Sequence, residues 1–315
     1  MNILFIADPL ASFKIYKDTT FAMMREAQKR GHQIFACEPR HLVWQSGQAV
    51  NAQVQQVHLT GKQDVWFEVH GVHTDRALHS FDALVMRKDP PFDSEYFYAT
   101  HLLEQAEREG AKVFNKPSAL RNHPEKLAIL EFAQFISPTL VTRDAQAIRA
   151  FHAMHRDIIL KPLDGMGGMG IFRVKDDALN LGAIIETLNR EGAQTVMVQK
   201  FRPAIAQGDK RVLVIGGKVV PFCLARIPQG GEVRGNLAAG GKGVAQAISA
   251  RDQEIANAIG PVLAQRGLLL IGLDVIGDNL TEINVTSPTC FQEIFDQTGC
   301  DVAALFMDAL ESAAA

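Results

Sequence analysis

The sequence predicts a protein of mixed class, with an open α/β domain at the N-terminus followed by an α+β domain. Two observations lead to this prediction. Short apolar runs alternate with helix-like segments over residues 1–121, and beyond them hairpin patterns with glycine turns take over. With 315 residues, the chain is long enough for two or three packed units that each have a core.

The composition excludes several kinds of protein. Apolar residues make up 47% of the chain and charged residues 21%, which is typical of a globular protein rather than a disordered one. The net charge of −3 argues against a broad surface for nucleic acid. Four cysteines without CxxC spacing suggest neither a zinc site nor a disulfide framework. All ten histidines lie at or before His155, so the second half has no Ser-His-Asp triad.

The opening MNILFIADPL has no basic n-region and is interrupted by Asp8 and Pro9, so we interpret it as a buried strand and not as a signal peptide. No apolar run is long enough to cross a membrane. We therefore expect a cytoplasmic protein with small-molecule partners, and neither a membrane nor a nucleic acid among them.

The first domain repeats one pattern, an apolar strand followed by a helix and a second strand. The pattern occurs at residues 2–7, 18–31 and 32–38, and again at residues 81–87, 95–110 and 111–117. Between the two copies, residues 41–80 are rich in Gln and His and fit no single pattern. Within them, residues 65–75 (VWFEVHGVHTD) are predicted to form a hairpin.

The pattern changes where Pro117 and Pro124 bracket a crossing segment, so we predict domains at residues 1–121 and 122–315. A helix is expected from about Glu125. Further helices are expected at 144–155, 177–191 and 251–266, a strand at 195–201, and hairpins around 165–170 and over 210–227 and 268–287.

The glycine cluster at residues 165–170 matches G-x-G-x-x-G, the fingerprint of dinucleotide-binding folds. That fingerprint works because a helix begins inside it, whereas Gly170 is followed by the strand-like IFRVK. We interpret the cluster as a hairpin turn that folds over nucleotide phosphates, with Lys161 as a charge beside it. A plain glycine turn is the alternative. A Walker motif is absent from the sequence.

The hairpin over 268–287 is predicted to gather three oxygen-bearing side chains. A three-residue connection at 277–279 would place Asp274 opposite Glu282, with Asn284 on the same face. Two close carboxylates in an apolar hairpin would raise each other's pKa unless a cation neutralised them. We predict Mg²⁺ there, or Mn²⁺ in its place, bridged to nucleotide phosphates. A solvated polar face is the alternative.

The hairpin over 210–227, which turns at two glycines, puts Arg211 and Arg226 on one face. The segment that follows, residues 228–243, holds six glycines together with Arg234 and Lys242. Structureless stretches of this length are usually lids or binding loops. Taken singly, each arginine is compatible with an ordinary surface charge, but together with the acidic residues they suggest a charged reaction centre.

Taken together, these parts resemble the ATP-grasp superfamily and, within it, the bacterial-type glutathione synthetase family. The resemblance runs nearly from end to end. It rests on RKDPPFD (87–93), NKPSALRNHPEKL (115–127), DIILKPLDGMGGMGIFRV (157–174), DKRVLVIGGKVVPFCLARIPQGGEVRGNLAAGGKG (209–243), GLDVIGD (272–278) and LTEINVTSPT (280–289). It implies a pre-ATP-grasp domain, then a two-lobed ATP-grasp domain with antiparallel sheets, a nucleotide-binding lobe at about 122–202, a catalytic lobe at about 203–315 and a lid at 228–243.

The resemblance also implies roles for individual positions. For ATP it implies Lys126, Lys161, Gly167, Gly168, Gln199, Lys200, Phe201 and Asp209. For the divalent ion it implies Asp274, Glu282 and Asn284, and for the transferred phosphoryl group and the acceptor carboxylate it implies Arg211, Arg226 and Arg234. For the peptide substrate we nominate Lys17, Asp18, Arg87, Asp89, Ser287 and Thr289.

The reaction implied by the resemblance begins with phosphorylation of the cysteinyl carboxylate of γ-glutamylcysteine by ATP. The glycine amine then attacks the acyl phosphate and releases phosphate. Other ATP-grasp ligases, of the D-alanine–D-alanine or glutamate-adding type, are the main alternative. A phosphotransferase that is not a ligase and a non-catalytic nucleotide sensor are further alternatives. A homo-oligomer is what the family implies.

Overall fold

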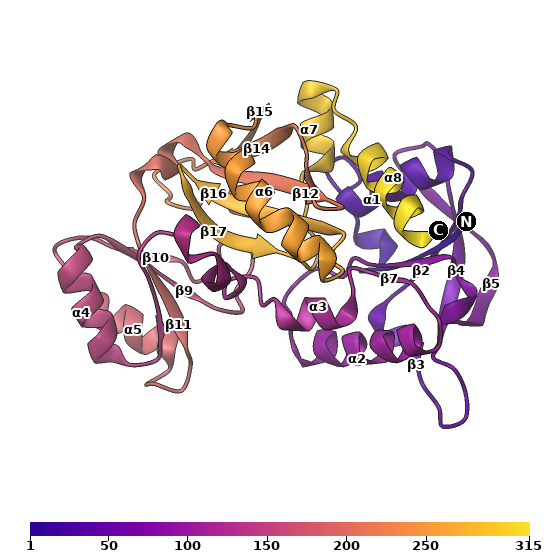
Figure 1. Cartoon of the computed structure of the whole chain (residues 1–315), viewed down its shortest axis with the longest axis horizontal. Coiled ribbons are helices and arrows are strands. Elements are labelled where there is room, and N and C mark those ends of the chain that lie inside the picture. The colour runs from indigo at the N-terminus through magenta and orange to yellow at the C-terminus, as the bar shows by residue number, and fades with distance from the viewer.

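The computed structural model describes residues 1–315 and contains three sheets, which lie in a row in Figure 1. The sheet formed by the N-terminal strands lies on the right, a six-stranded sheet in the centre and a four-stranded sheet on the left. Both termini lie at the right end, where α8 (Val302–Ala314) packs on α1 (Thr19–Lys29). None of the helices has the length and apolar character that a membrane crossing requires.

The N-terminal sheet has seven strands in the order β3-β4-β2-β1-β6-β7, with β5 on the outer side of β4. Strands β1, β2, β6 and β7 are parallel, as the two strand–helix–strand patterns predict. Helix α1 is capped by Asp18, whose side chain accepts from Phe21 N. The bounds are β1 Asn2–Ile6, β2 Gln33–Cys37, β3 Leu42–Val43, β4 Asn51–Leu59, β5 Phe67–Ala77, β6 Ala83–Met86, β7 Val113–Phe114, α2 Ser94–Arg108 and α3 Pro117–Asn122.

The hairpin predicted for residues 65–75 is wrong, because nearly all of this segment belongs to the single strand β5. The turn lies before it, and β5 runs back antiparallel to β4. Gly71, with φ of +78°, stands where the register between the two strands shifts. A glycine inside a strand pattern therefore marked a bulge and not a turn.

The four-stranded sheet is antiparallel, in the order β10-β9-β11-β8. It packs against two helices around nine buried apolar residues that form a core of their own. The turn between β9 and β10 holds the glycine cluster, as predicted. Helix α5 is shorter than expected, since Ala178 and Asn180 have positive φ. The bounds are β8 Thr139–Thr142, β9 Ile158–Pro162, β10 Phe172–Val174, β11 Val196–Lys200, α4 Ala145–His155 and α5 Leu181–Asn189.

The helix expected from Glu125 is not an α-helix. Residues 128–135 form a 3-10 helix with a kink at Phe132. The segment runs beside β17 (Asn279–Asn284), where Glu125 O accepts from Ile283 N and Ile136 bridges to Leu280. Tertiary pairing of the backbone overrides local helix propensity here.

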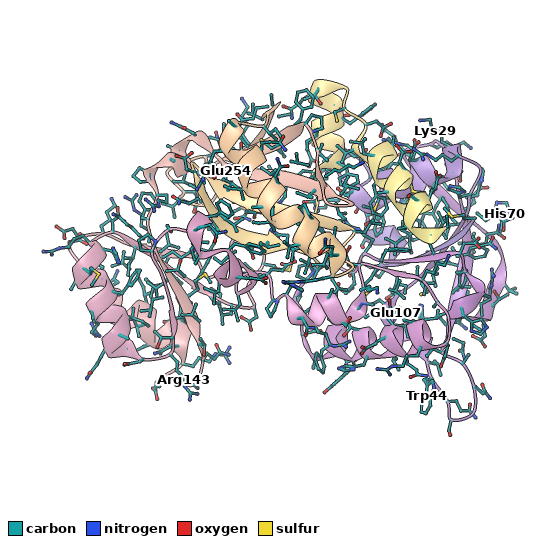
Figure 2. All side chains as sticks on the ribbon, in the orientation of Figure 1. Lys29, Trp44, His70, Glu107, Arg143 and Glu254 are labelled. Carbon is teal, nitrogen blue, oxygen red and sulfur yellow. The ribbon has the colours of Figure 1, made fainter.

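The six-stranded sheet has the order β15-β14-β12-β16-β17, with β13 paired to β12. Its apolar residues share two large core clusters with the N-terminal sheet, whereas the four-stranded sheet has a separate core. Charged side chains such as Lys29, at the edge of the molecule in Figure 2, and Glu254 are exposed rather than part of these layers. The bounds are β12 Asp209–Ile215, β13 Lys218–Val219, β14 Phe222–Ile227, β15 Lys242–Ala247, β16 Leu270–Ile276, α6 Ala250–Gln265 and α7 Phe291–Thr298.

Candidate active site

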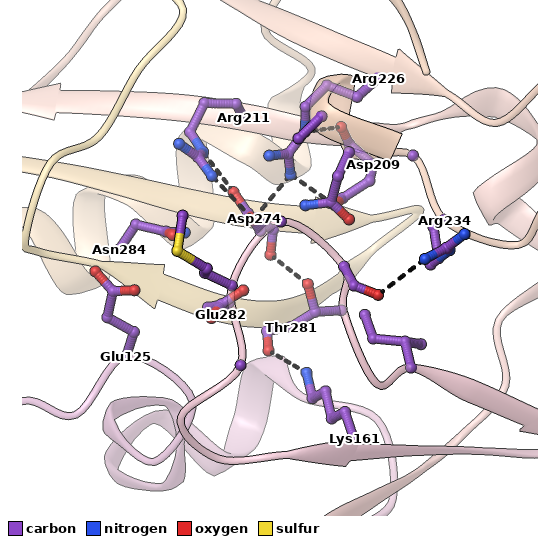
Figure 3. A pocket seen from close by; sticks show the side chains of 18 of the residues that line it. Glu125, Lys161, Asp209, Arg211, Arg226, Arg234, Asp274, Thr281, Glu282 and Asn284 are labelled. Carbon is purple, nitrogen blue, oxygen red and sulfur yellow. Dashed lines mark hydrogen bonds and ion pairs between the residues drawn. The ribbon is translucent and has the colours of Figure 1, made fainter. Parts of the chain in front are cut away.

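A pocket of about 310 Å³ lies between the four-stranded and six-stranded sheets (Figure 3). From the four-stranded side it is lined by β9, the glycine turn and Gln199 on β11. From the other side it is lined by β12, β14, β16 and β17. Strands far apart in the sequence thus place their charged residues around one space.

Four charged side chains form a chain of ion pairs in this pocket. Arg211 Nε donates to Asp274 Oδ1 at 2.6 Å. Arg226 Nη2 lies 2.8 Å from Asp274 Oδ2 and 2.6 Å from Asp209 Oδ2. Burial raises the pKa of Asp274, but Arg211 and Arg226 outweigh it and hold that pKa well below its usual range. Asp274 is therefore a carboxylate held between two cations.

Asp209 differs from Asp274 although both contact Arg226. Burial raises the pKa of Asp209 to about 6, and Arg226 offsets the increase only in part. Its Oδ1 is buried without a hydrogen-bond partner. A ligand with a hydroxyl or another donor would satisfy this oxygen.

The predicted common face of the two arginines is confirmed, although the hairpin is less regular than expected. Next to the Gly-Gly turn, Val214 pairs with Val219. Further along, Asp209 pairs with Arg226, which is a shift of two residues. Because side chains alternate with a period of two, a shift of two leaves every side chain on its original face.

Asp274 pairs with Glu282, and Gly272 with Asn284, as the sequence predicts. The predicted three-residue connection is nevertheless wrong, because Ile276 pairs with Asn279 across a two-residue turn. A bulge between Asp274 and Val275 adds one residue and restores the expected register. The three oxygen-bearing side chains therefore line the same pocket.

Two lysines flank these residues. Lys126 Nζ lies 3.1 Å from Glu282 Oε1 and donates to Gly165 O at 2.5 Å. Lys161 Nζ donates to Thr281 O at 3.1 Å. Burial lowers the pKa of Lys161; the charge of Glu282 offsets part of this decrease, and the charge of Lys126 adds to it. An anion such as a nucleotide phosphate would stabilise both ammonium groups.

The donor set of Asp274, Glu282 and Asn284 fits a hard divalent cation. Asn284 Nδ2 donates to Gly272 O at 3.3 Å, which leaves its amide oxygen available. Glu125 lies in the same pocket, where burial and then the nearby charge of Glu282 raise its pKa. A cation beside the two carboxylates would relieve this repulsion. No group of three or more His, Cys, Asp or Glu side chains is arranged to hold a metal ion by itself, so such an ion would need further ligands from a bound phosphate.

The glycine-rich segment 228–243 lies against the glycine turn. Arg234 Nη1 donates to Gly168 O at 3.4 Å, and its Nε donates to Glu232 at 2.9 Å. Strand β15 begins inside the predicted loop, so the irregular part ends at residue 241. A side chain at Gly235 would meet Arg226 O at 2.2 Å, which explains a glycine where the segment packs against the end of β14.

Most of the residues nominated from the sequence line this pocket. They are Asp89, Lys126, Lys161, Gly167, Gly168, Gln199, Asp209, Arg211, Arg226, Arg234, Asp274, Glu282, Asn284, Ser287 and Thr289.

The other five nominated residues do not line it. Lys200 is exposed, and Phe201 is buried beneath the guanidinium of Arg173. Arg87 is buried and donates to Thr20 Oγ1 and to Pro288 O, so it supports the pocket wall from behind. The remaining two are Lys17 and Asp18, of which Asp18 caps α1.

Glu125 and Thr281 are among the pocket residues that the sequence analysis did not nominate. Thr281 O accepts a hydrogen bond from Lys161 Nζ, and Thr281 Oγ1 donates to Asp274 O at 3.1 Å. Glu125 stands directly before Lys126, which is the only sequence signal that could have suggested it.

Comparisons with known proteins find the same similarity along the whole chain. The pattern of the prokaryotic glutathione synthetase N-terminal domain matches residues 1–121, and that of the prokaryotic glutathione synthetase ATP-grasp domain matches residues 125–299. A glutathione synthetase of Ralstonia nicotianae is 61% identical over 100% of this chain and 96% of its own length. One of Neisseria meningitidis serogroup A is 57% identical over 98% of both chains.

Solved structures show the same fold at low identity. D-cycloserine synthetase DcsG has a TM-score of 0.67 at 15% identity, covering 99% of this chain and 100% of the other. The ATP-grasp ligase PsnB, solved with Mg, ADP and a phosphomimetic variant of its minimal precursor, has a TM-score of 0.62 at 21% identity, covering 100% and 98%.

Proposed function

The chain belongs to the prokaryotic glutathione synthetase family, and we propose that its pocket joins glycine to γ-glutamylcysteine in a reaction that consumes ATP. One observation carries the proposal for the site. Lysines, hard oxygen ligands and two arginines surround a single cavity, and an ATP-dependent ligase needs all three kinds of group.

Residues 1–121 would form the domain on the peptide-substrate side. Residues 122–315 would form the ATP-grasp domain, with a nucleotide-binding lobe at about 122–202 and a catalytic lobe at about 203–315. Both lobes line the pocket, which is consistent with a nucleotide held between them.

ATP would lie between the lobes, with Lys126 and Lys161 at its phosphates. The turn that holds Gly167 and Gly168 lies beside Lys126, close enough for its backbone to meet a phosphate. Asp209 would accept from the ribose, which would satisfy its unpaired oxygen. Gln199 to Phe201 would hold the adenine, with Gln199 as the member that lines the pocket.

Asp274, Glu282 and Asn284 would hold Mg²⁺, or Mn²⁺ in its place, which supplies positive charge beside the nucleotide phosphates. Arg211 and Arg226 are already held in position by Asp274. They would stabilise the negative charge that develops as the cysteinyl carboxylate oxygen bonds to the γ-phosphorus and ADP leaves. The glycine nitrogen would then bond to the acyl carbon, lose a proton and expel phosphate.

Peptide and acceptor contacts would come from both domains. Asp89 accepts from Ser287 at the pocket wall, and Thr289 lies close by. Lys17 and Asp18 would contribute from the N-terminal domain. Arg87 would act on the substrate indirectly, through its bond to Pro288 O.

Residues 228–243 would act as a lid whose Arg234 meets the acceptor carboxylate. The cytoplasm is the expected compartment, since the four cysteines are free thiols. A homo-oligomer is expected from the family alone.

The test is an assay of ADP release in which γ-glutamylcysteine and glycine are each omitted in turn. We expect ADP and tripeptide in equal amounts with both substrates and little of either when one is missing. Turnover with D-alanine or glutamate instead would reassign the substrate. A stable phosphorylated product would indicate a phosphotransferase.

A further inference from the structure

Glu125 lies beside the proposed metal ligands without pairing with any cation. Its side chain lines the pocket next to Asn284 and Glu282 (Figure 3). Oε1 accepts three hydrogen bonds, from Val285 N at 2.9 Å, from Thr286 N at 3.0 Å and from Thr286 Oγ1 at 2.8 Å. With three donors on one oxygen, that oxygen is occupied by the protein itself.

The backbone of Glu125 bonds to the other side of the same ligand. Its carbonyl oxygen accepts from Ile283 N at 3.0 Å. Residues 283 and 285 flank Asn284, so one residue holds the chain on both sides of that side chain. The adjacent Lys126 contacts Glu282, the next proposed ligand along the strand.

Asn284 is the last residue of β17, where strand pairing ends. Beyond it, Val285 N and Thr286 N have Glu125 Oε1 as their partner in place of a neighbouring strand. Without that acceptor these groups would lose the bonds that order the chain after the strand, and the direction of the Asn284 side chain would be less well defined.

We propose that Glu125 is a positioning residue that orients Asn284, and with it the end of β17, for binding of the divalent ion. The inference rests on the proposed metal site. Residues that hold metal ligands in place typically change metal affinity by about 10–100-fold when they are replaced. The hydrogen bonds to Oε1, rather than the charge of the carboxylate, should carry the effect.

The experiment measures Mn²⁺ binding to the full-length, ADP-saturated enzyme, from the electron paramagnetic resonance signal of free Mn²⁺. Glu125→Ala should weaken Mn²⁺ binding about 10-fold or more. Glu125→Gln should restore the affinity to within about threefold, because an amide oxygen in place of Oε1 accepts the same three bonds. Glu131→Gln is the matched control, since Glu131 pairs with Arg266 outside the pocket and should bind Mn²⁺ like the wild type.

Thr286→Val removes one of the three donors and leaves Glu125 in place, so it decides the question if Glu125→Ala does not fold. It should also weaken Mn²⁺ binding. Wild-type affinity in folded Glu125→Ala or in Thr286→Val would overturn the inference, as would equal losses in the Ala and Gln variants. Asn284→Ala separates the two proposals: if it leaves Mn²⁺ affinity unchanged, the metal site itself is wrong.

Discussion

Arg226 Nη2 lies 2.8 Å from Asp274 Oδ2, although Arg226 is on β14, Asp274 is on β16, and β12 runs between these two strands. The contact is possible because both side chains project from the same face of the sheet, with Arg211 on the intervening strand beside them. Three adjacent strands thus contribute to a buried cluster of alternating charge, which Asp209 on β12 extends through its ion pair with Arg226. Several expected outcomes depend on this cluster and on the residues around it.

Glu282→Ala should lower turnover by orders of magnitude and leave the thermal midpoint close to that of the wild type. In the proposed site Glu282 would hold the divalent cation, and its side chain is partly exposed rather than part of the core. Initial rates and thermal melts of Glu282→Ala are compared with those of the wild type. Glu254→Ala, on the exposed face of α6, is the control. Loss of folded protein at unchanged specific activity would instead assign Glu282 a structural role.

Arg226→Lys should lower kcat by about 10³-fold while changing the KM for ATP much less, because in the proposed reaction Arg226 would stabilise the transferred phosphoryl group. Lysine keeps the charge but cannot contact Asp209 and Asp274 with a forked group. It is a sharper test than Arg226→Ala, which would leave two buried carboxylates without this partner and cost about 3–5 kcal/mol of stability. A kcat near that of the wild type would remove Arg226 from the mechanism.

Trypsin should cleave after Arg234 in the ligand-free enzyme and more slowly once MgATP and γ-glutamylcysteine are bound. Ordering a glycine-rich segment costs about 1 kcal/mol or more per residue, and anionic ligands at Arg234 and Lys242 offset that cost. Cleavage after Lys62, in the exposed turn before β5, is the control and should not change. If the ligands slow cleavage after Arg234 no more than cleavage after Lys62, the segment is not ordered by ligand binding.

A variant with residues 228–243 shortened should release more ADP than tripeptide, because water then reaches the acyl phosphate before glycine does. The ratio of the two products, measured in the same reaction, reports this uncoupling. A ratio that stays at one would show that the segment does not shield the intermediate.

Asp209→Asn should change how stability depends on pH. The pKa of Asp209 is about 6 in the folded protein, above its ordinary value near 4, so the folded state binds this proton more tightly. The associated stability is fully present below about pH 4 and is lost as the pH rises to about 6. Relative to Asp209→Asn, the ligand-free wild type should lose on the order of 2 kcal/mol across that window in urea unfolding. A constant difference between the two proteins would contradict this.

The sequence predicted the site well where local rules suffice. Alternation along strands placed Asp274, Glu282 and Asn284 on one face, and the same parity placed Arg211 and Arg226 together. Both results survived errors in the turns, because the bulge compensates for the shorter turn in one hairpin and a shift of two residues preserves the face in the other. Prediction failed for residues 65–75, where Gly71 permits either a turn or a bulge and only pairing with β4 decides between them.

The residue types, their spacing and the period of the strands determined by themselves that this chain carries a glycine turn beside a lysine, three oxygen-bearing side chains on one strand face and a pair of arginines on another. Only the tertiary structure decided which partners each acquires: Asp274 lies between two arginines, Arg87 turns toward Pro288, and Glu125 holds the chain after β17. The physical reason is the distance along the chain over which each effect acts. Propensity and alternation act between near neighbours in the chain, whereas a buried charge is stabilised by whichever opposite charge or hydrogen-bond donor the packing brings within about 3 Å.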